Sequence, residues 1–255
     1  MNWSFAKIHW RLLILGIFAI AMGTLEAIVV VYIRQLYYPQ GFDFPLTMLS
    51  LLSMECCREA ATIIMLAAVG IIAGKDNLQR FAYFLYAFAV WDIIYYAGLK
   101  VLLNWPSSFL TWDVLFLIPV PWIGPVLAPI ISSLTMILFG GIIICLQEKG
   151  YIVKIKLWEW SLTFLGAFII LCSFVWDYSR IIIREYFSAG LAAEENTGRI
   201  LKLILRYKPT HYNWSLFVLG EVLILCTLVL MCRRTRAGVE NDRKDIKPAT
   251  SSGQH

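Results

Sequence analysis

The sequence predicts an all-helical bundle that is integral to a membrane. Hydrophobic residues occupy 60% of the 255 positions, charged residues only 15%, and the mean hydropathy is +0.71. A soluble domain carries about 25% charged residues, so a fold in water would leave much apolar surface uncovered. The apolar residues also gather in long runs, and a helix needs about 20 residues to cross a hydrocarbon core of about 30 Å.

Six membrane-spanning helices are predicted, at about residues 12–33, 46–73, 81–103, 124–146, 158–177 and 213–232. The first run follows Lys7 and Arg11, as in a signal peptide. It continues past Glu26 without a small-residue cleavage site, so we expect it to remain as a helix. Residues 1–232 are thus predicted to form one transmembrane domain, and residues 233–255 a disordered, basic cytoplasmic tail.

The segment before the fourth helix is too rich in proline for an ordinary membrane helix. The string "FLIPVPWIGPVLAP" contains Pro119, Pro121, Pro125 and Pro129. Each proline removes a backbone donor and clashes with the preceding helical turn. Residues 109–123 are therefore predicted to form a short re-entrant or interfacial piece, whose polar backbone groups need protein or a wet cavity as partners.

Lys and Arg residues in the short loops predict the orientation. They gather near the N-terminus, after the second helix, after the fourth helix and in the tail, and these regions share one side if the chain crosses six times. Both termini are therefore predicted to be cytoplasmic. The short loops and the lack of an evident organelle signal favour a bacterial inner membrane. Residues 178–212 break the pattern, because they are rich in Lys and Arg on the predicted outside. Within them, about 198–208 is predicted to form an amphipathic interfacial helix.

The run "SMECCREAA", Ser53 to Ala61, places charges inside the second apolar segment. On a helix, Glu55, Arg58 and Glu59 share one face. A charged residue at the centre of a membrane helix costs about 2.5–3.5 kcal/mol on the insertion scale. This face is therefore predicted to turn inward, where Arg58 can pair with a carboxylate.

Further polar residues in the other segments are the expected partners. Glu26 lies in the first run, Asp92 in the third and Glu221 in the sixth. Counted at 1.5 Å per residue, most of these charges lie between the midplane of the membrane and its outer surface. The inner halves of the same helices are almost purely apolar. We therefore predict a polar, outward-facing cavity within the membrane. Its predicted binding residues are Glu26, Glu55, Arg58, Glu59, Asp92, Tyr96, Lys100 and Asp113.

Three classes of function fit such a cavity. The favoured one is binding and moving a small polar or cationic solute, or protons, because a carboxylate beside an Arg–carboxylate pair can hold a proton or a cation. The first alternative is an intramembrane enzyme that acts on an outer-leaflet lipid or lipid-linked group. In it, Glu55 or Glu59 would work with Asp92 as acid and base, and Arg58 and Lys100 would hold a phosphate. The second alternative is a binding or assembly subunit of a membrane complex.

Motifs do not decide between these classes. The sequence has no G-x-S-x-G, no H-E-x-x-H and no Cys near a His, so no catalytic residue is assigned and the question of an enzyme stays open. Neither a metal nor a cofactor is predicted, although clustered carboxylates in an enzyme could hold Mg²⁺ or Ca²⁺. The six cysteines are predicted to be buried small residues. The expected partners are membrane lipids, a small solute or lipid headgroup, and a second copy of the chain; nucleic acid is not expected.

Overall fold

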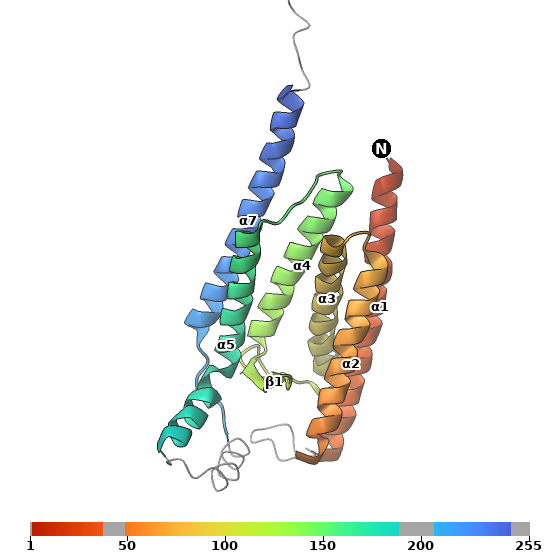
Figure 1. Cartoon of the computed structure of the whole chain (residues 1–255). Helices are drawn as coiled ribbons and strands as arrows, with labels where there is room; N and C mark the ends of the chain where they lie inside the picture. Colours follow the sequence, from red (N-terminus) through yellow and green to blue (C-terminus); the bar gives the residue numbers. More distant parts are fainter. Residues whose placement is uncertain (1, 38–48, 189–206, 246–255) are drawn as a thin grey trace, which may run out of the picture.

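The computed structural model describes residues 2–37, 49–188 and 207–245 (Figure 1). Within these ranges, six helices are long and apolar enough to cross a membrane. They are α1 (Asn2–Tyr37), α2 (Leu49–Ala73), α3 (Asn77–Leu103), α4 (Leu127–Glu148), α5 (Leu157–Ser188) and α7 (Trp214–Asp245). The prediction of an all-α, polytopic membrane bundle is confirmed. Residues 189–206, which contain most of the predicted interfacial helix at about 198–208, lie outside the described ranges.

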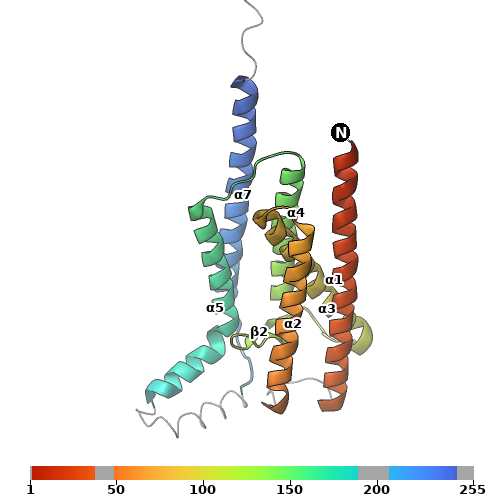
Figure 2. The same ribbon diagram turned by 45° about the vertical axis from the view of Figure 1, so that its right-hand side comes forward.

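The helices form two groups (Figures 1 and 2). In the first group, α3 packs against α1, α2 and α4, and in the second, α5 packs along α7. Glycines bring the second pair together, because a Cβ added to Gly166 would lie 2.8 Å from the carbonyl oxygen of Gly220, and one added to Gly220 would lie 2.6 Å from that of Gly166. Small residues of this kind let helix backbones approach closely in a membrane. The two groups meet where α4 contacts α7.

The Pro-rich segment folds into a β-hairpin, which agrees with the prediction that residues 109–123 form a short piece other than an ordinary membrane helix. Strands β1 (Trp112–Phe116) and β2 (Trp122–Pro125) pair antiparallel, with Asp113 opposite Gly124. Pro119 and Pro121 fall in the turn between the strands, and Pro125 ends β2. Prolines at turns and strand ends leave the ladder hydrogen bonds intact. The hairpin lies at one end of the bundle (Figures 1 and 2), which is called the hairpin end below.

The opposite end carries both the N-terminus and the end of α7 (Figure 1) and is called the tail end below. The structure corrects the predicted end of the last helix, because α7 continues to Asp245 rather than stopping at residue 232. Arg234 accounts for part of this extension. Its guanidinium pairs with the fully buried Glu159 of α5 at 2.6 Å and donates to the carbonyl oxygen of Lys154. Residues that are tied to α5 in this way continue the helix instead of forming a disordered tail.

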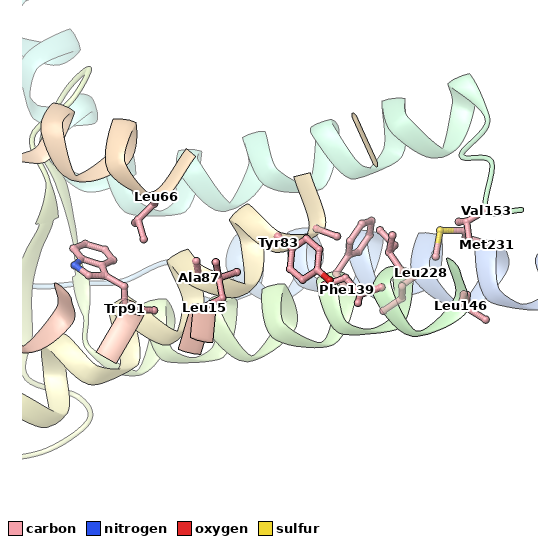
Figure 3. Close-up of a cluster of buried hydrophobic side chains, with 14 of the residues drawn as sticks. Leu15, Leu66, Tyr83, Ala87, Trp91, Phe139, Leu146, Val153, Leu228 and Met231 are labelled. Carbon is pink, nitrogen blue, oxygen red and sulfur yellow. The ribbon is translucent and has the colours of Figure 1, made fainter. Parts of the chain in front are cut away.

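The tail-end half of the bundle has an apolar core (Figure 3). Buried side chains from five helices, α1–α4 and α7, meet in it, and the core extends toward the hairpin through Leu66 and Trp91 to Phe116 of β1. Its tail-end members include Leu15, Tyr83, Phe139, Leu146, Leu228 and Met231. Charged residues at this end, such as the Lys75–Glu148 pair at 3.2 Å, lie at helix ends rather than inside the core.

The prediction for the cysteines is wrong. All six are free thiols, and none is fully buried: Cys57, Cys145 and Cys226 are exposed, and the other three are partly exposed. A thiol is apolar enough to face hydrocarbon, so these residues need no place in the core of a membrane protein.

Candidate functional site

An ion triad joins α1 to α2. Arg58 forms an ion pair with Glu26 of α1 and another with Glu55 of its own helix, the latter at 2.7 Å. The Thr62 hydroxyl donates a hydrogen bond of 3.3 Å to the Glu26 carboxylate. Glu26 is buried, whereas the Arg58 and Glu55 side chains keep 23% and 21% of their surface exposed. The charged face of α2 thus turns toward α1, and its outer edge stays accessible.

Glu59 points to a different partner. Its two carboxylate oxygens accept from the backbone N–H of Leu117, with N–O distances of 2.8 and 3.1 Å. Leu117 directly follows β1, so a buried carboxylate of α2 holds the turn of the hairpin. An ionised acceptor makes a stronger hydrogen bond than a neutral one, and it supplies the partner that a backbone group at membrane depth requires.

The first strand of the hairpin is anchored through Asp113. This carboxylate is 2% exposed, pairs with Arg34 at the end of α1 at 3.1 Å, and accepts from the Tyr96 hydroxyl of α3 at 3.2 Å. Arg34 also lies over the Trp105 ring, with 3.7 Å between the guanidinium carbon and the ring centroid. Burial raises the pKa of Asp113, and the charge of Arg34 opposes that rise. The hairpin is thus fixed to α1, α2 and α3.

Two further carboxyl groups converge on α4. Asp92 of α3 accepts from the Ser133 hydroxyl at 2.8 Å. Glu221 of α7 accepts from the hydroxyls of Ser132 and Thr135, both at 2.7 Å. Both carboxyl groups are buried. Since α4 packs against α3 and also contacts α7, the carboxyl groups reach the same turn of α4 from two helix groups. Asp92 and Glu221 are called the carboxyl pair below.

The carboxyl pair differs from the other buried acids in its partners. Across the ranges that the structure describes, neither Asp92 nor Glu221 forms an ion pair with Lys or Arg, whereas Glu26, Asp113 and Glu159 each do. In the same ranges, no group of three or more His, Cys, Asp or Glu side chains is placed to hold a metal ion. Among the described residues, the hydrogen bonds to the pair come from hydroxyl groups, and a hydroxyl can donate to a carboxylate or turn a lone pair toward a cation.

Lys100 lies apart from this network. The structure leaves it exposed, and its ammonium donates to the carbonyl oxygens of Asn104 and Pro106 at 3.5 and 3.0 Å. It therefore caps the end of its own helix instead of joining Asp92 and Tyr96. The other seven of the eight predicted site residues all take part in the contacts described above. Glu26, Glu55 and Arg58 form the triad, Glu59, Tyr96 and Asp113 hold the hairpin, and Asp92 belongs to the carboxyl pair.

These acids share one half of the bundle. Glu26 lies eleven residues before the end of α1, Glu59 ten residues after the start of α2, and Asp92 eleven residues before the end of α3. Glu221 lies seven residues after the start of α7. At 1.5 Å per residue these separations place the acids about 10–16 Å from the hairpin end of their helices. The apolar core of Figure 3 fills the remaining length toward the tail end.

Aromatic side chains of the hairpin pack near the helices that carry the carboxyl pair. Trp112 and Trp122 pack on the same apolar cluster as Ile131 and Ile224. Ile131 is next to Ser132 in α4, and Ile224 lies one turn after Glu221 in α7. The Trp122 ring stacks on Phe174 of α5, with 6.1 Å between centroids. The hairpin thus lies at the hairpin end of the helices that carry the pair, and it touches both helix groups.

The fold and the site define an integral membrane protein with ionisable groups inside its helical bundle. Comparisons with protein-family models, with curated proteins and with solved structures give no match.

Several residues of the site were not among the predicted set. They include the hydroxyl donors Ser132, Ser133 and Thr135, as well as Arg34 and Glu221. The hydroxyls do leave a signal, because "SSLT" interrupts an otherwise apolar helix. Hydroxyl side chains commonly bridge helices within membranes, so this string marks the face of α4 that meets the acids.

Proposed function

We propose that this protein binds a small cation, or a proton, at the carboxyl pair and moves it across the membrane. One observation supports the proposal above all. Asp92 and Glu221 are buried at membrane depth, are held by hydroxyls of a single helix turn, and have no ion pair with Lys or Arg among the described residues. Ionisable residues in such positions mark ion pathways and proton relays.

The chemistry of the pair favours reversible occupancy. A charged carboxylate without a cationic partner is costly in apolar surroundings, so a bound proton or cation stabilises it. The hydroxyls of Ser132, Ser133 and Thr135 can rotate between donating to the carboxylates and directing a lone pair at a cation. Groups that exchange partners by rotation bind a cation without a large rearrangement of the backbone.

Movement across the membrane requires the two helix groups to shift against each other. Asp92 belongs to the group of α1–α4, and Glu221 belongs to the α5–α7 pair. The apolar core blocks the tail end, and the hairpin covers the opposite end. Relative motion at the contact between α4 and α7 would change the separation of the two acids and open one side at a time, as in alternating access.

We also propose that the tail end is cytoplasmic, in a bacterial inner membrane. Arg11, Lys75, Arg80 and the Lys-bearing connection between α4 and α5 all lie at the tail end of their helices, as the distribution of positive charge in cytoplasmic loops predicts. A membrane-impermeant thiol reagent tests this. In intact cells it should spare a cysteine placed at Ile152, which is 79% exposed in that connection, and labelling of that cysteine would reverse the orientation.

Ion flux in vesicles tests the transport proposal. The purified protein is reconstituted with an indicator inside that responds to H⁺, Na⁺ or K⁺, and gradients of the three ions are applied in turn. Asp92→Asn and Glu221→Gln should each reduce the flux of one of these ions more than about tenfold, a barrier change of about 1.4 kcal/mol. Asp177→Asn is the matched control, because Asp177 also accepts from a hydroxyl, that of Tyr207 at 2.7 Å, but lies outside the pair.

The outcomes are distinct. Flux that depends on both acids of the pair and not on Asp177 supports the proposal. Equal flux through all three variants, or no flux of any of the three ions through the unmodified protein, overturns it.

A further inference from the structure

The C-terminal part of α5 projects away from the bundle. In Figures 1 and 2 the teal end of this helix leans away from α7 instead of continuing beside it. Residues 179–188, called the α5 arm below, follow the buried Tyr178. This arm is independent of the carboxyl pair and raises a separate question, namely what it contacts.

The base of the arm is firmly fixed. Tyr178 is buried against Ile123 of β2 and against Tyr207, with 6.1 Å between the tyrosine rings. The Tyr207 hydroxyl donates to the Asp177 carboxylate at 2.7 Å. The residues before the arm are therefore held in a packed junction between α5, the hairpin and the segment before α7.

The arm begins at the level of the membrane surface. The apolar span of α5 ends at Ile181, and the junction at Tyr178 lies beside the hairpin. Trp and Tyr side chains are common where hydrocarbon meets headgroups, and this end of the bundle is rich in them. They include Trp105, Trp112, Tyr207, Tyr212 and Trp214.

The exposed side chains of the arm combine apolar and cationic character. Ile181 and Ile183 are 42% and 54% exposed, and Arg180 and Arg184 are exposed one helical turn apart. Residues four apart share a helix face, so the two guanidinium groups lie together. An isoleucine favours the acyl boundary, and a guanidinium binds phosphate through paired N–H groups. Helices with this combination lie in the membrane interface.

We propose that the α5 arm lies in the headgroup layer at the hairpin end and binds anionic phospholipids through Arg180 and Arg184. The charge of the arm and its depth together indicate an anionic phospholipid as the ligand. The arm offers positive charge and apolar surface at the boundary where phosphate groups and acyl chains meet. The proposal does not depend on cation transport by the carboxyl pair.

A fluorophore on the arm tests it. The six native cysteines are replaced, Ile183→Cys is labelled with an environment-sensitive fluorophore, and the full chain is reconstituted in two kinds of vesicle. One contains phosphatidylcholine alone, and the other contains phosphatidylcholine mixed with phosphatidylglycerol, each with a headgroup-attached quencher. Ile152→Cys, exposed in the connection between α4 and α5, is the reference position for the label.

The expected result has two parts. The Ile183 label should be quenched more strongly in the vesicles with phosphatidylglycerol, and Arg180→Gln with Arg184→Gln should remove that difference. Each charge near an anionic surface changes partitioning about fivefold. Arg233→Gln with Arg236→Gln, which removes equal charge from exposed positions of α7, should leave the difference unchanged.

Two results would overturn the proposal. One is a label at Ile183 that reports water in both kinds of vesicle. The other is equal quenching in both kinds of vesicle, because the arm would then bind the interface without recognising anionic lipid.

Discussion

The Glu59 carboxylate of α2 accepts a hydrogen bond from the backbone N–H of Leu117, at 2.8 Å to one oxygen and 3.1 Å to the other. This contact divides the charged run of α2 into two roles. Arg58 and Glu55 belong to the triad with Glu26, whereas Glu59 holds the turn of the hairpin. A single helix face thus stabilises both the packing of α1 on α2 and the hairpin.

Removing the Glu59 carboxylate should loosen the hairpin. Glu59→Leu leaves the Leu117 N–H without its acceptor, and a buried donor without a partner costs about 1–3 kcal/mol. The measurement is the midpoint of unfolding in detergent, together with thiol labelling of Ser132→Cys in a cysteine-free background. We expect a lower midpoint and faster labelling.

Glu59→Gln and Glu55→Leu are the controls for that prediction. The glutamine keeps an oxygen that can accept from Leu117, and Glu55 contacts Arg58 rather than the hairpin. Labelling at position 132 that is as fast in Glu55→Leu as in Glu59→Leu would show that Glu59 does not hold the hairpin in place.

Breaking the Arg34–Asp113 pair should destabilise the protein in a pH-dependent manner. Arg34→Met leaves Asp113 buried and charged, and breaking a buried pair costs about 3–5 kcal/mol. Burial already raises the pKa of Asp113, and loss of the opposing Arg34 charge raises it further. In the variant, the pKa of Asp113 is then higher in the folded protein than in the unfolded chain. At a pH above this folded-state pKa the variant carries the full destabilisation, and protonation of Asp113 relieves it as the pH falls through that pKa.

Unfolding of Arg34→Met measured as a function of pH checks the sign. Lowering the pH should reduce the difference in unfolding free energy between the variant and the unmodified protein. When Arg34→Met is combined with Asp113→Asn, this difference should depend much less on pH. A difference that widens on acidification would contradict the assignment of Asp113 as the unpaired group.

The sequence predicts the helices well and the site only in part, for physical reasons. Runs of about 20 apolar residues permit little except a spanning helix, and the cost of charge in hydrocarbon predicts that Glu55 and Arg58 turn inward. Spacing also placed Lys100 on the face of Asp92. The long, flexible lysine chain instead reaches the carbonyl oxygens past the end of α3, where Asn104 adopts a left-handed conformation with φ 52°.

The hairpin and the hydroxyls of α4 were harder to predict because they depend on distant contacts. Strand pairing at 112–125 is stabilised by anchors from three other helices, through Glu59, Arg34 and Tyr96. Helical periodicity marks a polar face of α4 but does not say which acids meet it. Only the packing of α3 and α7 on α4 brings Asp92 and Glu221 to adjacent hydroxyls.

Glycine substitutions test the packing of α5 on α7. Gly166→Ala places a Cβ 2.8 Å from the backbone oxygen of Gly220, and overpacking of this kind costs about 1–3 kcal/mol. We expect a lower midpoint of thermal unfolding. Gly141→Ala is the control, because a Cβ at Gly141 meets nothing within 4 Å. An equal effect of the two substitutions would contradict the close approach of α5 and α7.

The Thr135 hydroxyl should matter for cation binding, on the assumption that the carboxyl pair is the site. Thr135→Val conserves the shape of the side chain and removes the donor to Glu221, and loss of one such ligand should weaken the apparent affinity about tenfold, or about 1.4 kcal/mol. Thr135→Ser retains the hydroxyl and should bind almost normally. Concentration-dependent flux measures both, and equal affinities in the two variants would exclude Thr135 from the site.

The central claim is that the carboxyl pair itself takes up and releases the cation or proton. Infrared difference spectroscopy of the protein in vesicles tests this most directly, because it reports the protonated and ionised forms of carboxyl groups when H⁺, Na⁺ or K⁺ is changed. We predict a carboxyl band that responds to one of these ions and disappears when Asp92→Asn and Glu221→Gln are combined. A spectrum that no ion alters, or a response that survives in the double variant, would contradict the claim.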